Sequence, residues 1–443
     1  MTDHTRAVRL AATALDFDLT PEERAELELH RAECVRCRQT DDDFRADAAA
    51  LRRLPHRDAP SQLRHTVAEA AWREAQPHRS RTGLVLLVAA ILMLAMAIGG
   101  GLAASQWLRR DDGATGPTPT VGSLRSDLPL AAGPVSLLID TDVAPDDLVA
   151  IAFLVAAPDV SIRAISVSGT GEVRCDAGVR IVLGLLDRLD APQIPVACGR
   201  EKPLALGHAF PSVFRENAER AAGLGLPMSR RQVAAIGAVG LINSTVRDAE
   251  GKLRILTLGP LTNLAEAFDQ DATLAAAIEA VYVMGGAVDV PGNVAGSPDA
   301  PADNAAAEWN IYADPTAAQI VLAAGAQLFL VSLDGTSQVP VTPAFVDRVR
   351  DATGTGLEVL AELFAKNSYM TSGDYYLWDP LAAIAAAGYP IGEFEPVHLT
   401  VDESDGPTSG ATRRTDGAPN ASYLSAVDAH LVEELMISIL NAE

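Results

Sequence analysis

The feature that most constrains the fold of this 443-residue chain is a series of short, unbroken apolar runs that begins at residue 135. Continuous rather than alternating apolar strands indicate strands that are covered on both faces, as in a parallel sheet. Helical stretches such as DDLVAIAFLVAA and TNLAEAFDQDATLAAAI separate these runs. We therefore predict an α/β domain over residues 134–443, with a mostly parallel open sheet and helices on both faces. The predicted strands are 135–140, 162–169, 254–259, 280–286 and 326–334.

A second apolar feature precedes this domain. Residues 83–108 contain no charged side chain and include GLVLLVAAILMLAMAIGGGLAAS. A transmembrane helix needs about 20 such residues, and a buried core helix is the alternative. The segment begins too far from the N-terminus for a cleaved signal peptide. We predict one transmembrane helix over 83–108, after a juxtamembrane segment (59–82) and before a linker (109–133) rich in Gly, Pro, Ser and Thr.

The charge of the chain is concentrated after that helix. Residues 1–82 carry 14 Arg and 15 Asp or Glu, whereas residues 111–443 carry 19 Lys or Arg and 43 Asp or Glu. So acidic a domain repels phosphate backbones, and we therefore exclude nucleic acid as a partner. Solubility accounts for most of this charge, but a site for a hard cation would also draw on carboxylates.

Four acids stand within eight residues directly after the first predicted strand, where a helix begins: Asp140, Asp142, Asp146 and Asp147. Ligands bind at the carboxyl ends of strands in sheets of this kind. Burying acids there costs free energy unless an opposite charge neutralises them. A helix N-terminus stabilises each acidic side chain by only roughly 0.3–1 kcal/mol. Helix capping in a solvated loop is the plainer interpretation. We favour a hard cation, Ca²⁺ or Mg²⁺, with oxygen ligands.

The block DTDVAPDD (140–147) resembles the DTDPGxDD signature of the inosine–uridine preferring nucleoside hydrolases. The resemblance continues in order along the chain. LGPLTNLAEA (258–267) is similar to that family's GPLTN segment, AEWNIYADPTAA (307–318) to its EFNxxxDPEAA segment, and YLWDPLAA (376–383) stands where the family has a late HDP element. The resemblance implies a calcium-dependent glycosidase that hydrolyses the N-glycosidic bond of ribonucleosides, in purine or pyrimidine nucleoside metabolism.

The same resemblance implies roles for the matching residues on the metal side. It places Asp142, Asp147, Asp379 and the backbone carbonyl of Leu258 around Ca²⁺. It also makes Asp142 the general base for the attacking water, because a bound cation lowers that water's pKa. Such a reaction passes through an oxocarbenium-like ribosyl, which nearby carboxylates stabilise.

On the sugar side, the resemblance implies that Asp146 and Asn310 bind ribose hydroxyls. Glu308 and a loop Asn would hold the 5′ side of the sugar. That Asn is identified with Asn293, and Asn304 is the runner-up because the loop before Glu308 is longer than the family pattern.

Three positions depart from the family pattern. Val143-Ala144-Pro145 replaces its Pro-Gly, and Thr170 stands where many members have a substrate-binding Asn. Trp378 replaces a His that in some members helps to protonate the departing base. Trp378, Tyr375 and Tyr376 either stack on a base or pack the core, and the sequence leaves both open. We include Thr170 and Trp378 among the expected substrate-binding residues.

The first 58 residues carry a separate pattern. His30, Cys34 and Cys37 form HxxxCxxC, which has the ligand types and the spacing that zinc needs, and His4 is the candidate for the fourth ligand. LTPEERAELELHRAECVRC (19–37) is similar to the zinc-binding anti-sigma domain of bacterial membrane regulators. The resemblance implies an extracytoplasmic-function sigma factor as partner, with this domain in the cytoplasm. A zinc-free helical anchor is the alternative.

These features together predict a single-pass protein of the cell membrane whose hydrolase-like domain is extracytoplasmic. Its small-molecule partner would be a nucleoside, which the outer domain hydrolyses or, alternatively, senses with little turnover. An inert contact domain is a third reading. Cys175 and Cys198 form a disulfide if that side is oxidising, or stay as two buried thiols. The sequence leaves a homo-oligomer open.

Overall fold

The computed structural model describes Arg24, Leu27, His30, Cys34 and residues 133–249, 253–297, 301 and 303–441. Two compact units make up the chain, 1–116 and 117–443, and each is described by itself. The predicted juxtamembrane segment, the predicted membrane helix over 83–108 and most of the predicted linker lie outside the described residues. Within the described part of the chain, no helix has the length and apolar character needed to cross a bilayer.

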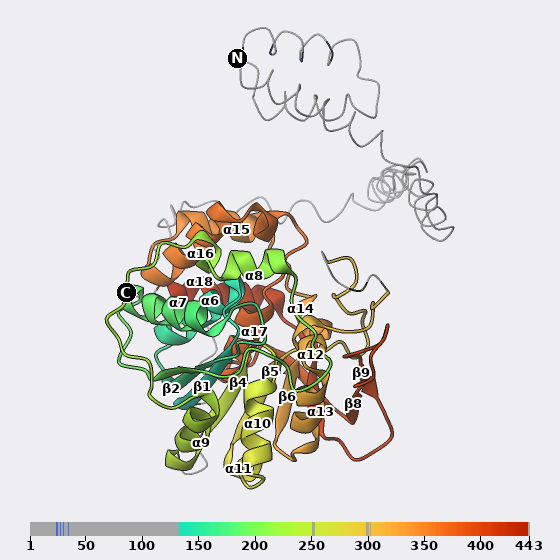
Figure 1. Ribbon diagram of the computed structural model, residues 1–443. Helices are drawn as coiled ribbons and strands as arrows, with labels where there is room; N and C mark the ends of the chain where they lie inside the picture. The colour runs from blue at the N-terminus through green and yellow to red at the C-terminus, as the bar shows by residue number, and fades with distance from the viewer. Residues whose placement is uncertain are drawn as a thin grey trace, which may run out of the picture. The chain divides into compact units, whose positions relative to one another are not determined.

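An eight-stranded sheet forms the centre of the second unit (Figure 1). Its strand order is β3-β2-β1-β4-β5-β6-β10-β7, and every neighbouring pair is parallel except β10 with β7. The predicted mostly parallel sheet is therefore confirmed. The strands are β1 (Val135–Thr141), β2 (Val160–Val167), β3 (Val196–Cys198), β4 (Leu253–Thr257), β5 (Ala280–Met284), β6 (Leu328–Val331), β7 (Gly392–Val397) and β10 (Ala421–Val427), and β8 (Leu399–Val401) and β9 (Thr412–Arg414) form a separate antiparallel pair.

All five predicted strands are present, as β1, β2, β4, β5 and β6. The strands that the apolar runs did not predict are short or lie toward the edge of the sheet. β3 has only three residues. β7 is an edge strand that exposes Glu393 and Glu395, so its sequence reads as polar rather than apolar. A search for continuous apolar runs detects central strands and misses edge strands for this reason.

Helices cover both faces of the sheet, as predicted (Figure 1). On one face lie α6, α7 and α15 to α18, and on the other lie α9, α10, α11 and α13. The long helices are α6 (Pro145–Ala156), α7 (Cys175–Arg188), α9 (Ala238–Asp248), α10 (Thr262–Gln270), α13 (Pro315–Ala323), α15 (Pro343–Asp351), α16 (Thr355–Lys366), α17 (Trp378–Ala386) and α18 (Ala429–Leu440). Shorter helical segments are α8 (Ser212–Ala218), α11 (Leu274–Ala277), α12 (Trp309–Ala313), α14 (Leu333–Thr336) and the 3₁₀ turns η2 (Ala221–Gly223) and η3 (Ser368–Thr371).

The helix after β1 is deeply buried. α6 starts at Pro145, a residue suited to the first turn, and its residues from Pro145 to Leu154 are all buried. A helix that is apolar on all sides belongs in a core rather than at a surface. α6 packs against α16, α17 and α18, and it therefore holds the loop that follows β1 in a fixed place.

One covalent link ties the edge of the sheet to a helix. Cys175 at the start of α7 and Cys198 at the end of β3 form a disulfide, which decides between the two alternatives left by the sequence. The link closes a loop across 23 residues of sequence. It also fixes the end of the segment that runs from β2 to α7.

Removing this link should destabilise the protein. For a loop of this size, the loss of chain-entropy restraint predicts that replacing both cysteines by serine lowers the free energy of unfolding by about 3 kcal/mol. Chemical denaturation of the purified protein, compared with the native chain before and after reduction, measures the change. Equal denaturation midpoints for the native chain and the double variant would contradict a stabilising role for the disulfide.

Candidate active site

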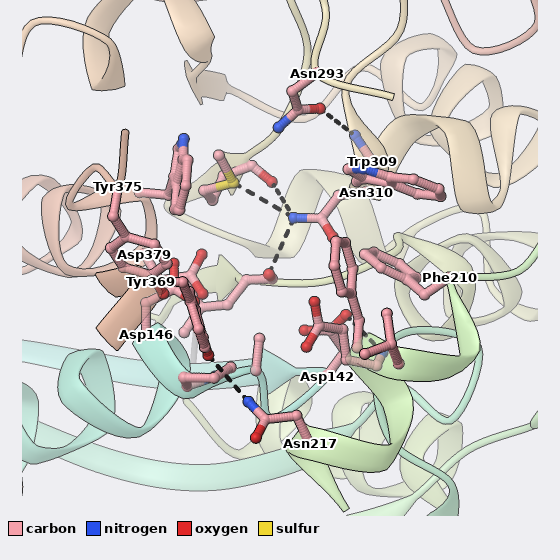
Figure 2. A pocket seen from close by; sticks show the side chains of 18 of the residues that line it. Asp142, Asp146, Phe210, Asn217, Asn293, Trp309, Asn310, Tyr369, Tyr375 and Asp379 are labelled. Carbon is pink, nitrogen blue, oxygen red and sulfur yellow. Dashed lines mark hydrogen bonds between the residues drawn. The ribbon is translucent and has the colours of Figure 1, made fainter. Parts of the chain in front are cut away.

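A cavity of about 540 Å³ opens at the carboxyl ends of the parallel strands, the edge where the sequence predicted ligand binding. Figure 2 shows its wall, which combines strand ends, the start of α17 and side chains of α8 and η3. This volume is within the usual range for a small-molecule site. Its acidic lining consists of Asp142, Asp146, Glu172, Glu216, Glu308 and Asp379.

Three carboxylates converge beside the cavity, and two of them, Asp146 and Asp379, line it. Asp146 and Asp147 come from the first turn of α6, and Asp379 from the first turn of α17, two helices that pack against each other. One oxygen of each lies within 4.8 Å of the other two, and all three side chains are buried. Two aspartates predicted as metal ligands, Asp147 and Asp379, are therefore brought together, and Asp146 joins them.

The electrostatics of this group favour a bound cation. Burial and the neighbouring Asp147 raise the pKa of Asp146 to about 7 and that of Asp379 well above its ordinary value. Burial also raises the pKa of Asp147, whose Oδ2 is buried and has no hydrogen-bond partner among the described residues. Acids that repel one another without a compensating positive charge fit a hard divalent cation with oxygen ligands.

Asp142 lines the same cavity but lies outside this tightest group of oxygens. Its Oδ2 accepts a hydrogen bond from the backbone N–H of Glu172 at 3.0 Å. Gly171 and Gly259 approach from two sides, and a Cβ at Gly171 would stand only 2.1 Å from the same oxygen. Burial raises the pKa of Asp142, as do Asp147 and Glu172. The carboxylate is thus held in one orientation by backbone alone.

The turn that carries Asp142 is strained. Val143 adopts a φ of 60°, a left-handed backbone that is unfavourable for a β-branched residue. Its N–H donates to Thr141 Oγ1 at 3.0 Å and to Asp147 Oδ1 at 3.2 Å. Thr141 Oγ1 also donates to that Asp147 oxygen. These bonds hold the strained turn, and strain of this kind is concentrated at functional sites.

The fourth predicted metal ligand, the Leu258 carbonyl, lies just beyond β4, and Leu258 lines the cavity. Asn310 Nδ2 donates to this carbonyl at 3.1 Å and to the carbonyl of Met284 at 3.2 Å, as the dashed lines in Figure 2 show. Both amide protons of Asn310 therefore fix backbone carbonyls, so its oxygen is the atom left for a ligand.

Glu308 and Asn293 lie farther along the same wall. Glu308 caps α12, accepting from the backbone N–H groups of Asn310, Ile311 and Gly286. Burial raises its pKa to about 7 in spite of these bonds. Asn293 Oδ1 accepts from the N–H of Trp309 at 3.1 Å, which leaves its amide toward the cavity (Figure 2).

The structure distinguishes the two loop asparagines of the prediction. Asn304 is fully buried, donates to the Ser409 carbonyl and accepts from the N–H of Ala307, so it serves the loop itself. Asn293 is the one that lines the cavity.

Thr170 does not line the cavity. It is buried, and its hydroxyl bonds those of Ser168 at 2.9 Å and Thr262 at 3.0 Å. Thr262 in turn donates to Asp314. The Thr170 side chain, one atom shorter than Asn, thus bonds other hydroxyls inside the protein. The expectation that Thr170 contacts the ligand finds no support in this position.

Of the three aromatic residues at and just before the start of α17, two line the cavity and one does not. Tyr375 and Trp378 line the cavity, with ring centroids 4.7 Å apart in an edge-to-face arrangement, whereas Tyr376 does not line it. Tyr375 is buried, and a hydrogen bond from it offsets part of the rise in the pKa of Asp146 that burial causes. Tyr375 is therefore anchored to the acidic group, and Trp378 is the partly exposed ring beside it.

Sequence reasoning missed most of the opposite wall. It includes Glu172 and Tyr369, together with residues of or next to α8, namely Phe210, Val213, Phe214, Glu216, Asn217 and Arg220. Asn217 Nδ2 donates to the Tyr369 hydroxyl at 3.0 Å and so joins α8 to η3 (Figure 2). None of these residues lies in a recognisable pattern, and only Glu172 offered a signal, because it follows the end of a predicted strand.

Of the predicted zinc ligands, His30 and Cys34 are described, whereas His4 and Cys37 lie outside the described residues. His30 is buried and Cys34 half-buried, and the Cys34 N–H donates to the His30 carbonyl at 2.8 Å. The two residues are therefore one helical turn apart, as the spacing predicted.

Comparisons with known proteins agree with this geometry. Residues 137–434 match the family described as inosine-uridine preferring nucleoside hydrolase. The chain is 30% identical over 254 residues to uridine nucleosidase 1 of Arabidopsis thaliana, covering 56% of this chain and 73% of that one. It is 31% identical over 230 residues to pyrimidine-specific ribonucleoside hydrolase RihA of Klebsiella pneumoniae, covering 51% and 69%. Among solved structures, the plant nucleoside hydrolase PpNRh1 is similar with a TM-score of 0.63 and 28% identity, over 70% of this chain and all of that one.

The raised pKa values predict how stability depends on pH. Asp146 and Glu172 have folded-state pKa values of about 7 and about 8, above their ordinary values of about 4. Their stabilising contribution is therefore complete below pH 4 and is lost as pH rises through 7 to 8. We expect the Tm of the protein in chelator to fall between pH 5 and pH 8, and Ca²⁺ to raise Tm more at pH 8 than at pH 5.

Thermal denaturation at both pH values, with and without Ca²⁺, measures this. Asp379→Asn is the matched variant, because it removes one repelling carboxylate from the group. It should weaken both the pH dependence and the Ca²⁺ shift. A Ca²⁺ shift that is equal at the two pH values would argue against a cation among these acids.

Proposed function

This chain belongs to the inosine-uridine preferring nucleoside hydrolase family and is a nucleoside hydrolase, and from that premise we propose that it cleaves ribonucleosides with a calcium ion held by Asp142, Asp147, Asp379 and the Leu258 carbonyl. The observation that carries this proposal is the convergence of buried, mutually repelling carboxylates at one end of the cavity. Asp146 lies among them, so a ribose bound at this end of the cavity would lie against carboxylates.

In this mechanism each described residue has a distinct task. A bound divalent cation would neutralise the acids and lower the pKa of water in the cavity. Asp142, fixed by the Glu172 N–H, accepts a proton from the attacking water. Asp146 and the Asn310 oxygen bind ribose hydroxyls. The carboxylates around the ring stabilise the positive charge that develops on the ribosyl group as the N-glycosidic bond breaks.

The remaining residues hold the ends of the substrate. Glu308 and Asn293 bind the 5′ side of the sugar, and backbone N–H groups already fix the Glu308 carboxylate. Trp378 stands where a proton donor to the base would be expected, and an indole cannot supply that proton as a general acid. We therefore place the base against the aromatic and α8 wall, without assigning its identity.

We further propose that the enzyme is tethered to the cell membrane by residues 83–108, with this domain outside and residues 1–58 inside. The Cys175–Cys198 disulfide supports an oxidising compartment for the hydrolase domain. The one-turn spacing of His30 and Cys34 supports a zinc site in the N-terminal domain, which would bind a sigma factor. In that case the outer domain also senses nucleosides, and Trp378 in place of His favours slow turnover.

Asp142→Asn tests the catalytic proposal. Loss of a general base should lower kcat for ribose release by about 100- to 10,000-fold, since the amide keeps the size of the side chain but cannot accept the proton. Ribose release by the purified protein is measured with uridine, cytidine, inosine and adenosine, with and without chelator. Nucleoside binding without release in the native chain would favour the sensor, and unchanged release in the variant would refute the role of Asp142.

The acidic lining predicts discrimination against nucleotides. Among the described lining residues, Arg220 is the only cationic side chain, and it stands against six acids. A 5′-phosphate brings about two negative charges into this field. We expect kcat/KM for uridine 5′-monophosphate to be at least about 100-fold below that for uridine. The comparison is repeated at higher salt, where the difference in kcat/KM between the two substrates should become smaller. Equal kcat/KM for uridine and uridine 5′-monophosphate would contradict electrostatic exclusion of nucleotides.

The zinc proposal has its own test. Zinc content of the purified full chain is measured for the native protein and for His4→Ala and His30→Ala. We expect near-stoichiometric zinc in the native chain and a loss of most of it in both variants, because tetrahedral zinc needs four ligands. Zinc that is retained in His4→Ala would exclude His4 as the fourth ligand.

A further inference from the structure

The loop between β2 and α7 contacts Asp142. Its two ends are fastened by bonds that do not involve Asp142. At the start, the Ser168 hydroxyl donates to the Pro260 carbonyl and the Thr170 hydroxyl bonds Thr262. At the end, the disulfide joins Cys175 to Cys198.

Between these ends lies the dipeptide that contacts Asp142. Gly171 packs against the carboxylate so closely that no side chain fits, and the next N–H, of Glu172, donates to Asp142 Oδ2 at 3.0 Å. A rotation of the Gly171–Glu172 peptide would move that N–H away from the acid. Whatever fixes this peptide therefore fixes Asp142.

A side chain from α8 holds the carbonyl at the start of this dipeptide. Arg215 Nη2 donates to the backbone carbonyl oxygen of Thr170 at 3.1 Å. Arg215 Nε is buried and has no hydrogen-bond partner among the described residues, so the guanidinium has been drawn inward at a cost. Burial and the like charge of Arg174 lower the pKa of Arg215, and the acids Glu219, Asp142 and Glu201 counteract this. Arg215 is not part of the cavity lining.

We propose that Arg215 is a positioning residue, which orients the Asp142 carboxylate by holding the Thr170 carbonyl and thereby the Gly171–Glu172 peptide. The inference rests on the proposed function only through the role of Asp142. It adds a second consequence, because α8 also supplies Asn217, Phe214 and Val213 to the cavity wall. The helix that forms part of the cavity wall would thus also hold the general base.

A neighbouring arginine provides a matched control. Arg174 lies on the same loop and forms an ion pair with Glu219, the residue that directly follows α8. That pair is at the surface, with more than half of the Arg174 side chain exposed, and Arg174 does not contact the Thr170 carbonyl. Arg174→Met removes the same charge and the same side-chain type as Arg215→Met, but it leaves the Asp142 contacts in place.

The experiment compares the native full chain with Arg215→Met, Arg215→Lys and Arg174→Met. We expect Arg215→Met to lower kcat for ribose release by about 10- to 100-fold with less than a threefold change in KM. Arg215→Lys, which keeps a donor on a shorter stem, should fall between Arg215→Met and the native chain. Arg174→Met should stay within twofold of the native chain. Thermal denaturation shows whether each variant is folded.

Three outcomes would overturn the proposal. A folded Arg215→Met variant with native kcat would show that Arg215 does not act on Asp142. A change in KM alone would assign Arg215 to substrate binding, and an equal loss in Arg174→Met would reduce the effect to charge. If Arg215→Met does not fold, the same comparison is made with Arg215→Lys against Arg174→Lys.

A readout without turnover separates this proposal from the proposed function. The concentration of Ca²⁺ that produces half of the Tm shift is measured for each variant. Displacement of Asp142 should raise it at least about threefold in Arg215→Met and leave it unchanged in Arg174→Met. A native chain that releases no ribose would refute the proposed turnover, yet this Ca²⁺ comparison would still decide the positioning role. Equal Ca²⁺ midpoints in all variants would refute the positioning role of Arg215.

Discussion

Electrostatic repulsion among buried carboxylates is the constraint around which the hydrolase domain is organised. Asp146, Asp147 and Asp379 form one buried group, of which Asp146 and Asp379 line the cavity, and burial raises the pKa of each. Such a group persists only if the surrounding structure is rigid enough to hold it. That rigidity comes from the packing of α6 against α17, because the acids lie in the first turns of these two helices. Their N-termini also offer partial positive charge to the acids.

The position of Asp142 depends on a different kind of contact. Backbone from two separate strand ends, at Gly171 and Gly259, closes around its carboxylate. Side chains could not approach so closely, and a backbone N–H provides a donor that does not change its protonation. Asp142, which the proposed mechanism makes both a calcium ligand and the base, is therefore held by the main chain, whereas Asp146, Asp147 and Asp379 are held by helix packing. Asp142 and the three clustered acids thus have separate supports.

The cavity is also divided in how its walls are built. The acidic side consists of strand ends and long helices, whereas the opposite side is formed by α8, η3 and the residues before α17. Short helices and loops tolerate substitution better than a sheet core does. It follows that the sugar and metal side can stay constant while the base side changes. The departure from the family pattern at Trp378 fits this division, since Trp378 lines the cavity and does not belong to the acidic group.

The sequence by itself determined the parallel sheet, its five central strands and the acids at the strand ends, because each of these leaves a local signal. Apolar runs report burial on both faces, and collinear similarity identifies individual positions. Only the tertiary structure decided that Asn293 rather than Asn304 reaches the cavity, that Thr170 turns inward, and that Arg215 holds the loop of Asp142. These facts depend on which segments meet in space. The residues next to each of these positions in the sequence do not show which distant segment it will contact.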